Sequence, residues 1–325
     1  MLFNLDTSSD VPRLAPLKLP RQLQSRQGWA KLMEMQRTPQ PFVHQIEVTN
    51  HCPYRCIMCP RDQQMSRDLG YMAMDLYAKL IAEMATFPEE IKARELELFH
   101  FGESLLHPQL DEMVAIASTA GLKPVLSVNP PHLKPAISER LLKAKPHRII
   151  LSIDGFDAQS YREIRGQPAH FAQAVKHVEA LVACHRERNS ETDLLVRMIH
   201  MHRNSDQVAR MEAFWRSVGV RFEPREFFPW TESELAALGE HGKNPPHMPC
   251  PFPWSYLVVQ WDGSVVGCCR DLNGENRLGN ANQRSLQEIW GGPAYRQFRA
   301  MHAAGDFSQS PLCAKCDPIY FNPGE

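Results

Sequence analysis

Three cysteines close together in the sequence have the spacing with the clearest chemical use. Cys52, Cys56 and Cys59 are separated by gaps of three and two residues, so three thiolates can bind three corners of a [4Fe–4S] cluster. One iron then stays open for a chelating ligand. A structural zinc site is the alternative, but zinc normally takes four ligands, and the fourth would be His51, directly beside Cys52. The pattern therefore favours an iron–sulfur cluster with an open coordination site.

Four further cysteines lie in the C-terminal part of the chain. Seventeen residues separate Cys250 from Cys268, and within this gap Asp262-Gly263 lies between two β-rich runs, a good hairpin signal. A Cys-x-x-Cys pair, Cys313 and Cys316, follows a helical pattern. Four sulfurs brought together in this way suit a second [4Fe–4S] cluster or a zinc ion, and their spacing does not choose between the two.

Charge, composition and the N-terminal sequence argue against a secreted, membrane-bound or nucleic-acid-binding protein. The N-terminus lacks a basic start followed by an apolar stretch, so it is not a secretory signal, and we expect a cytoplasmic protein. Its nine cysteines should then serve metal binding or catalysis rather than disulfides. With 36 Lys and Arg against 37 Asp and Glu, and no apolar run long enough to span a bilayer, neither nucleic acid nor membrane is an expected partner.

Two cysteines remain outside both sets. Cys184 lies on a helical pattern among valines and leucines and is expected to be a small core residue. Cys269 adjoins a predicted ligand, so it could replace Cys268 as the ligand or face the substrate.

The segments that would position these cysteines alternate between strand and helix patterns. Strands are expected over 43–49, 95–100, 123–128, 148–153, 193–199 and from 220 onward. Helices are expected between them, over 75–84, 108–120, 137–144, 171–186 and 205–218. Repeated β-α units predict a parallel sheet, and six of them fit a partial, open (β/α)6 TIM-like barrel, because the closed barrel needs eight. Chemistry should lie at the carboxyl ends of its strands.

Changes in composition indicate three parts of the chain. Residues 1–41 hold several prolines and little periodicity apart from a short helical pattern around 21–37, and we expect a leader segment there. Residues 42–229 carry the barrel. Residues 230–325 begin with a linker rich in Gly, Pro, His and Asn. They continue with the hairpin and a helix over 285–302, which predicts a small hairpin-plus-helix auxiliary cluster domain.

Over residues 42–229 the chain resembles the radical S-adenosylmethionine (SAM) superfamily, on the three-cysteine motif and on short motifs at successive strand ends. Phe101-Gly102-Glu103 looks like the family's Gly-Gly-Glu motif, with Phe101 in place of the first Gly, and implies that Glu103 holds the amino group of SAM. Asn129 falls where the family often has Thr-Asn-Gly. Ser152 and Arg165 are placed like residues that contact the carboxylate or the ribose of SAM. Met58 replaces a common aromatic residue whose backbone contacts the adenine.

The C-terminal cysteines resemble the twitch form of the SPASM domain, in which a cysteine, a hairpin, a second cysteine, a helix and Cys-x-x-Cys follow in this order. The full form has further cysteines, and none follows Cys316 in this sequence. The resemblance implies one auxiliary [4Fe–4S] cluster, held by Cys250, Cys268, Cys313 and Cys316, with zinc as the alternative. The expected cofactors are therefore two [4Fe–4S] clusters and SAM.

The resemblance also implies a reaction. SAM would be cleaved to a 5′-deoxyadenosyl radical, which abstracts hydrogen from the substrate. The layout is similar to that of a twitch-type dehydrogenase acting on an aminocyclitol. We therefore expect oxidation of a small polar substrate, sugar-like or aminocyclitol-like, with the auxiliary cluster as electron acceptor. An external donor such as flavodoxin or ferredoxin would supply the reducing electron.

Three alternatives stay open. An epimerase would use Cys269 to return a hydrogen atom to the substrate radical. A peptide-modifying maturase is less favoured, because the segment before residue 42 is too short for a domain that binds a leader peptide. A non-catalytic iron–sulfur or zinc scaffold would need none of Glu103, Ser152 and Arg165.

Overall fold

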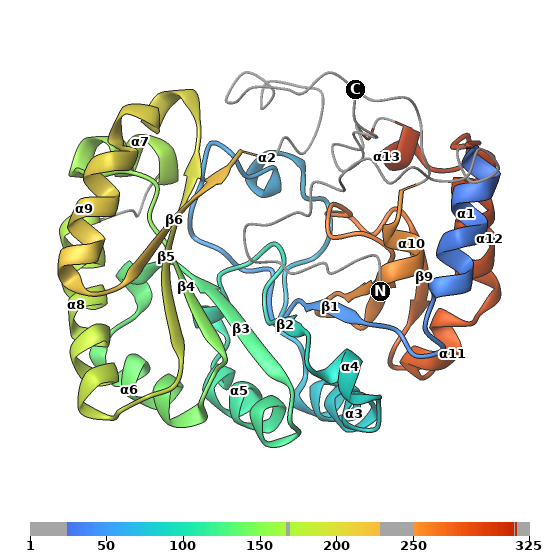
Figure 1. Cartoon of the computed structure of the whole chain (residues 1–325), viewed down its shortest axis with the longest axis horizontal. Coiled ribbons are helices and arrows are strands. Elements are labelled where there is room, and N and C mark those ends of the chain that lie inside the picture. The colour runs from blue at the N-terminus through green and yellow to red at the C-terminus, as the bar shows by residue number, and fades with distance from the viewer. Residues whose placement is uncertain (1–24, 167–169, 228–249, 315, 317–325) are drawn as a thin grey trace.

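One continuous nine-stranded sheet organises the protein (Figure 1). The computed structural model describes residues 25–166, 170–227, 250–314 and 316. The strands lie in the order β6-β5-β4-β3-β2-β1-β7-β8-β9. Their bounds are β1 (Val43–Ile46), β2 (Glu95–Glu97), β3 (Lys123–Val128), β4 (Arg148–Ser152), β5 (Asp193–His200), β6 (Arg221–Glu226), β7 (Leu257–Val259), β8 (Ser264–Val266) and β9 (Arg277–Asn280). Strands β1 to β6 pair in parallel, β7 pairs in parallel with the other edge of β1, and β8 and β9 continue antiparallel.

Most helices of the barrel lie along the outer side of the curved sheet in Figure 1, whereas the short helix after the three-cysteine loop is drawn at the top centre. Those of the barrel are α2 (Arg61–Gln64), α3 (Met74–Ala85), α4 (Glu89–Lys92), α5 (Leu110–Thr119), α6 (Pro135–Ala144), α7 (Ala158–Arg165), α8 (Phe171–Glu187) and α9 (Val208–Val218). The remaining ones are α1 (Arg26–Gln36) before the barrel and α10 (Phe252–Ser255), α11 (Leu286–Trp290), α12 (Pro293–Ala304) and α13 (Pro311–Ala314) after it. Short 3-10 turns occur at Ser104–Leu106, Pro130–His132 and His202–Gln207.

Side chains along each strand point alternately toward the helices and toward the concave side of the sheet, where the candidate site lies. Leu126 and Val128 of β3 and Leu151 of β4 are fully buried in the core that the helices share. Because successive side chains of a strand point to opposite faces, residues such as Ser127 and Ser152 face the concave side. The predicted partial (β/α)6 barrel is confirmed, and each of its six predicted strands is present.

Helix α7 was not predicted from the sequence, although it carries Arg165. Asp157 caps its start by accepting hydrogen bonds from the Gln159 and Ser160 amides at 3.0 and 2.8 Å, and Ser160 completes a capping box. The helix ends at Gly166, which has a φ of 70°. An N-cap Asp and a terminal Gly are a start and a stop signal for a helix, so the sequence did contain the evidence.

The C-terminal strands extend the sheet of the barrel. Val43 of β1 pairs with Leu257 of β7, and the predicted hairpin of β7 and β8 turns at Gly263, whose φ is 84°. The helix predicted over 285–302 is instead two helices, α11 and α12, because Gly291-Gly292-Pro293 interrupts it and Pro293 starts the second. The predicted boundary at 229/230 and most of the predicted linker lie outside the described residues, as do residues 1–24 of the predicted leader.

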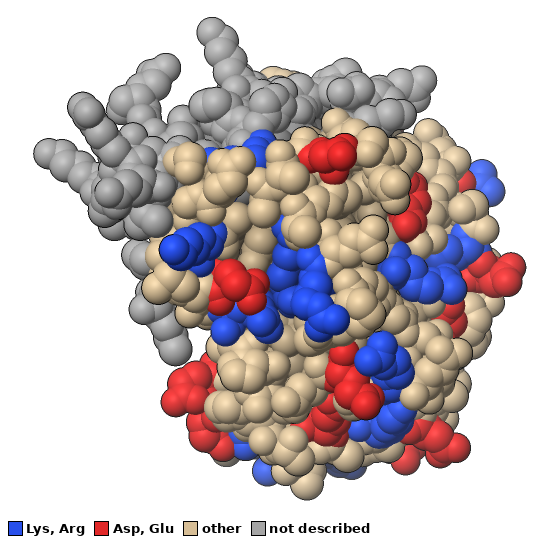
Figure 2. Space-filling model, turned by 90° about the vertical axis from the view of Figure 1, so that its right-hand side faces the viewer, with Lys and Arg blue, Asp and Glu red and all other residues tan. Residues whose placement is uncertain are grey.

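Helix α1 packs against the C-terminal helices on the right of Figure 1. Trp29 and Met33 bury their side chains against Trp254, whose indole N–H donates to Glu34 at 2.9 Å. Figure 2 shows this side of the molecule, where basic and acidic side chains are interspersed. None of the described helices is long and apolar enough to cross a membrane.

Candidate active site

The three-cysteine loop follows β1 and is docked against the end of α7. The Arg55 amide donates to the carbonyl of Arg165 at 3.3 Å, and the Ile57 amide donates to that of Ile164 at 2.9 Å. Burial is the main cause that raises the pKa of Cys52 and of Cys56 to about 12, and it raises that of Cys59 as well. The negative charge of a Cys59 thiolate would raise the pKa of Cys52 and of Cys56 further. Adjacent, desolvated thiols suit metal ligation, because bound iron stabilises the thiolates that burial disfavours.

Gly102 brings the end of β2 against this loop. A Cβ atom on Gly102 would lie 2.0 Å from the Thr49 carbonyl oxygen, so only glycine allows this approach. The Glu103 amide donates to the His51 carbonyl at 2.8 Å. The Phe101-Gly102-Glu103 motif is therefore packed directly on the chain that leads into Cys52.

Glu103 is completely buried and hydrogen-bonded. Its Oε1 accepts from the Leu105 amide at 3.0 Å, and its Oε2 accepts from the backbone and side-chain N–H groups of Asn129 at 2.8 and 2.5 Å. Burial raises the pKa of Glu103, against the opposing effect of these bonds. A carboxylate has about four acceptor positions, so Oε1 retains one that an ammonium group can use.

Arg165 continues this network toward β4. Its Nε donates to Asp154 and its Nη1 to the Asn129 side-chain oxygen, both at 2.5 Å, while Nη1 also lies 3.9 Å from the Cys56 sulfur. Burial opposes the charge of Arg165, but Asp154 and Cys56 outweigh it and raise the pKa of the guanidinium. Glu103, Asn129 and Arg165, which the sequence predicted separately, thus form one buried network, and Nη2 makes no hydrogen bond to any described residue.

Ser152 lies in a neighbouring row of polar side chains on the concave side of the sheet. Its hydroxyl is 3.3 Å from that of Ser127, and its register partner on β5 is Arg197. Arg197 donates through Nε and Nη2 to Glu223 Oε2 at 2.9 and 2.7 Å. Glu223 Oε1 is buried and has no hydrogen-bond partner among the described residues. We call these four residues the polar row: Ser127, Ser152, Arg197 and Glu223.

The remaining predicted SAM contacts are apolar side chains. Met58 is packed with Ile164, Met201 and Phe227. Phe101 is 4% exposed, and its ring lies 4.2 Å from that of His100, measured between centroids. Both side chains are used in packing, so any contact they make with a cofactor would come from their backbone atoms.

The C-terminal cysteines share one environment at the end of the hairpin. Burial and then the neighbouring Cys316 raise the pKa of Cys250, and burial raises that of Cys313 to about 11. Arg270 donates its amide to the Cys268 sulfur at 3.3 Å and its Nη1 to the Cys316 sulfur at 3.2 Å. No group of three or more His, Cys, Asp or Glu among the described residues converges on a single metal ion, so the fit of a cluster rests on these surroundings. Buried thiols that receive hydrogen bonds suit an iron–sulfur cluster.

Cys269 lies beside Cys268 in the same environment. The hydroxyl of Tyr256 is 3.4 Å from the Cys269 sulfur. A hydrogen bond from the Cys268 thiol outweighs burial and lowers the pKa of Cys269 below its usual value, with His44 and Tyr256 contributing. Either cysteine is therefore in position to act as a ligand. Cys184 is partly buried on α8 against the core, as its predicted role requires.

Sequence reasoning missed Asp154, Arg197 and Glu223. Asp154 follows Ser152 by two residues, the strand period, so it lies on the same side of the sheet. Arg197 and Glu223 occupy alternating positions of β5 and β6, and only the strand register shows that they are partners.

Comparisons with known proteins agree with this geometry. The family model for the Radical SAM superfamily matches residues 46–210, and that for SPASM, an iron–sulfur cluster-binding domain, matches 250–317. An AdoMet-dependent heme synthase of Methanosarcina barkeri is 30% identical over 135 residues, which cover 42% of this chain and only 37% of the relative. The S-adenosyl-L-methionine-dependent 2-deoxy-scyllo-inosamine dehydrogenase of Niallia circulans is 21% identical over 85% of this chain and 92% of its own length.

Two solved structures share the fold. One is that of BtrN in complex with AdoMet and 2-DOIA, with a TM-score of 0.54 and 19% identity over 85% of this chain and 92% of the other. The other is that of Streptococcus suis SuiB bound to the precursor peptide SuiA, with a TM-score of 0.67 and 14% identity over 91% of this chain and 74% of the other. At these identities the likeness concerns the fold.

Proposed function

Because this chain belongs to the radical SAM superfamily and carries a SPASM iron–sulfur domain, we propose that it oxidises a small polyhydroxylated substrate. It is a radical SAM enzyme whose cofactors are SAM, a [4Fe–4S] cluster and auxiliary iron–sulfur centres. The observation that carries the proposal is the polar row, which faces the concave side of the barrel next to the Glu103 network. A relative that covers most of the chain is named as an aminocyclitol dehydrogenase, and this supports a sugar-like or aminocyclitol-like substrate.

The cofactors have ligands in this chain. Cys52, Cys56 and Cys59 would hold the first cluster, and Cys250, Cys268, Cys313 and Cys316 would hold the auxiliary one. Together SAM and the first cluster supply a hydrogen-abstracting 5′-deoxyadenosyl radical. Glu103 would accept the amino group of SAM at its free Oε1 position, and Arg165 would offer Nη2 to the carboxylate. Charge-assisted bonds of this kind orient a zwitterionic ligand better than neutral ones.

The polar row would bind and deprotonate the substrate. Ser127 and Arg197 donate hydrogen bonds to substrate hydroxyl groups, while Ser152 beside them keeps its predicted role as a contact of SAM. The unpartnered Oε1 of Glu223 accepts the proton of the carbinol that is oxidised. Arg197 holds this carboxylate in place through two hydrogen bonds to Oε2, which leaves Oε1 to the substrate. Oxidation of a carbinol requires the loss of a hydrogen atom from carbon, a proton from oxygen and one electron, and an auxiliary cluster held by the C-terminal cysteines would supply the acceptor for that electron. An external carrier such as flavodoxin or ferredoxin supplies the electron that starts the reaction.

Epimerisation is the second candidate, and the position of Cys269 supports it. Its sulfur lies 3.4 Å from the Tyr256 hydroxyl and beside Cys268, and a protonated thiol there would return a hydrogen atom to a substrate radical. The contact of Cys269 with Cys268, a proposed ligand of the auxiliary cluster, favours oxidation over epimerisation.

Isotope labelling separates the two reactions. Anaerobically reconstituted enzyme is incubated with SAM, dithionite and carbon-deuterated aminocyclitols and polyols, with 2-deoxy-scyllo-inosamine among them. We expect deuterium in 5′-deoxyadenosine and a product that lacks two hydrogens. In heavy water the product should gain no carbon-bound deuterium, and Cys269→Ala should remain active. A product of unchanged mass that acquires one deuterium from heavy water, with activity lost in Cys269→Ala, would establish the epimerase instead.

A further inference from the structure

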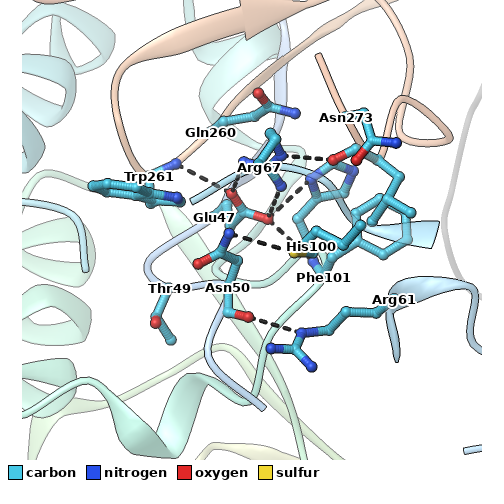
Figure 3. Close-up of polar contacts among 12 residues, drawn as sticks. Glu47, Thr49, Asn50, Arg61, Arg67, His100, Phe101, Gln260, Trp261 and Asn273 are labelled. Atoms are coloured by element: carbon cyan, nitrogen blue, oxygen red, sulfur yellow. Dashed lines mark hydrogen bonds and ion pairs between the residues drawn. The ribbon is translucent and has the colours of Figure 1, made fainter. Parts of the chain in front are cut away.

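A buried carboxylate at the end of β1 contacts segments from both halves of the protein (Figure 3). Glu47 is 0% exposed, and the two terminal nitrogens of Arg67 donate to its two oxygens, each at 2.8 Å. The amide of Trp261, at the hairpin turn, donates to Oε2 at 3.2 Å, and that of Phe101 donates to Oε1 at 3.4 Å. Burial alone would raise the pKa of Glu47, but its bonds to His100 and Arg67 lower it to about 2. This carboxylate is therefore a permanent negative charge.

His100 carries the contact on to the auxiliary cluster loop. Its Nδ1 lies 3.4 Å from Glu47 Oε1, and its Nε2 donates to the backbone carbonyl of Cys269 at 2.7 Å. The His100 side chain is only 2% exposed. The imidazole of His100 thus connects the backbone next to Cys268 with Glu47, which follows β1 and precedes the Cys52 loop.

Arg67 makes a second connection between the same two regions. Its Nε donates to the Leu272 carbonyl at 2.6 Å. Beside it, Asn273 accepts from the Ser66 amide at 2.8 Å and donates to the Gln64 carbonyl at 2.9 Å. The segment that leaves Cys59 is therefore bonded along its length to the segment that leaves Cys268.

We propose that Glu47, Arg67 and His100, here called the Glu47 hub, set the position of the auxiliary cluster relative to the SAM-binding cluster. Glu47 and His100 are positioning residues, since neither directs a free polar group at a substrate. The contacts of the hub reach the end of the Cys52–Cys59 loop, the Phe101-Gly102-Glu103 motif, the hairpin turn and the Cys268–Cys269 peptide. A change at one cluster loop would displace the other through these bonds. The inference goes beyond the proposed function, because it concerns the two clusters and holds for any substrate.

His100→Phe in the reconstituted holoenzyme tests the hub. Phenylalanine keeps a flat aromatic side chain of similar size, while the polar contact with Glu47 and the hydrogen bond to the Cys269 carbonyl are lost. His107→Phe is the matched control. His107 is also buried, and its ring nitrogens contact two backbone groups, the Met72 carbonyl at 3.0 Å and the Gln109 amide at 3.2 Å, neither of which belongs to a cluster loop.

Two measurements on these variants need no substrate. Pulsed electron paramagnetic resonance of dithionite-reduced protein reports the magnetic interaction between the two clusters. Hydrogen exchange reports local opening of residues 268–273. In His100→Phe we expect a broadened distribution of intercluster distances and exchange faster by about tenfold or more at 268–273, with unchanged iron content. His107→Phe should match the wild type in both.

The proposal is overturned if His100→Phe and His107→Phe give the same intercluster distribution and the same exchange. If His100→Phe yields no protein that contains both clusters, Asn273→Ala replaces it, because the half-buried Asn273 bonds Ser66 and Gln64 beside Arg67. We then expect faster hydrogen exchange in both 64–68 and 268–273. Faster exchange in only one of these segments would show that the two loops are not coupled. Failure of the oxidation proposal leaves these measurements unaffected, because no turnover enters them.

Discussion

At the scale of single residues, the polar side chains of the candidate site form most of their hydrogen bonds with one another. Asn129 bonds Glu103 through two N–H groups and accepts from Arg165, which in turn bonds Asp154. Each buried polar atom thereby avoids the cost of desolvation without a partner. The consequence is rigidity, since the acceptor on Glu103 and the donor on Arg165 that remain free point from fixed positions.

Glu103→Gln should weaken binding of SAM without changing the iron content. Glutamine keeps the shape but loses the charge, and a charge-assisted hydrogen bond contributes about 1.5–3 kcal/mol. This loss corresponds to an affinity lower by roughly tenfold to a hundredfold. Isothermal titration of anaerobic holoenzyme with SAM measures it. The matched control is Glu95→Gln, at the amino end of the strand β2 that precedes Glu103, which should bind SAM like the wild type. Equal affinity in wild type and Glu103→Gln would exclude Glu103 from the site.

At the scale of elements, β1 and the chain after it form the common support of the molecule. Strand β1 has β2 on one side and β7 on the other, and its continuation meets the Gly102 turn. The backbone at Gly102 touches that of Thr49 so closely that neither can move without the other. The position of Glu103 therefore depends on how these two strand ends are packed.

Gly102→Ala should show this dependence. A methyl group 2.0 Å from the Thr49 carbonyl forces the two strand ends apart, and overpacking of this kind costs about 1–3 kcal/mol or more. We expect a lower midpoint of anaerobic urea unfolding, followed by circular dichroism, together with weaker SAM binding. Gly291→Ala is the control, because its φ of −84° suits alanine and its nearest neighbour would be 3.5 Å away. Its midpoint should be unchanged or slightly higher. Equal effects of the two substitutions would contradict this account.

At the scale of the whole molecule, the two cluster sites belong to one sheet. The C-terminal strand β7 lies directly beside β1, with β8 and β9 beyond it, and the Glu47 hub connects the two cysteine loops by hydrogen bonds. The cysteines predicted as ligands are nevertheless in separate places, each set with its own buried environment. Each set should therefore bind its cluster when the other is removed.

Iron analysis tests this separation. Reconstituted wild-type protein should hold about eight irons per chain, the sum of two four-iron clusters. Replacing Cys52, Cys56 and Cys59 together by Ala should leave about four and abolish cleavage of SAM. Iron and zinc are measured by plasma mass spectrometry on the same samples. About four irons with one zinc in the wild type would contradict the auxiliary cluster, and it would leave the radical chemistry intact.

The sequence by itself determined the features that depend on local spacing. The gaps within Cys52–Cys59 predicted the first cluster, and alternation of strand and helix patterns predicted the six-unit barrel, which the structure confirms. The predictions for Glu103, Asn129, Ser152 and Arg165 depended on their positions at successive strand ends. These features can be predicted from the sequence because ligand spacing and hydrophobic periodicity are short-range properties of the chain.

The tertiary structure alone decided which of these residues are partners. Arg197 and Glu223 became a pair through the register of β5 and β6, and Asp154 became the partner of Arg165 through the packing of α7. Glu47 and His100 are far from Cys269 in sequence, and only the pairing of β7 with β1 brings the hairpin beside them. Strand register and sheet order are set by many weak contacts between distant segments, which no local pattern encodes.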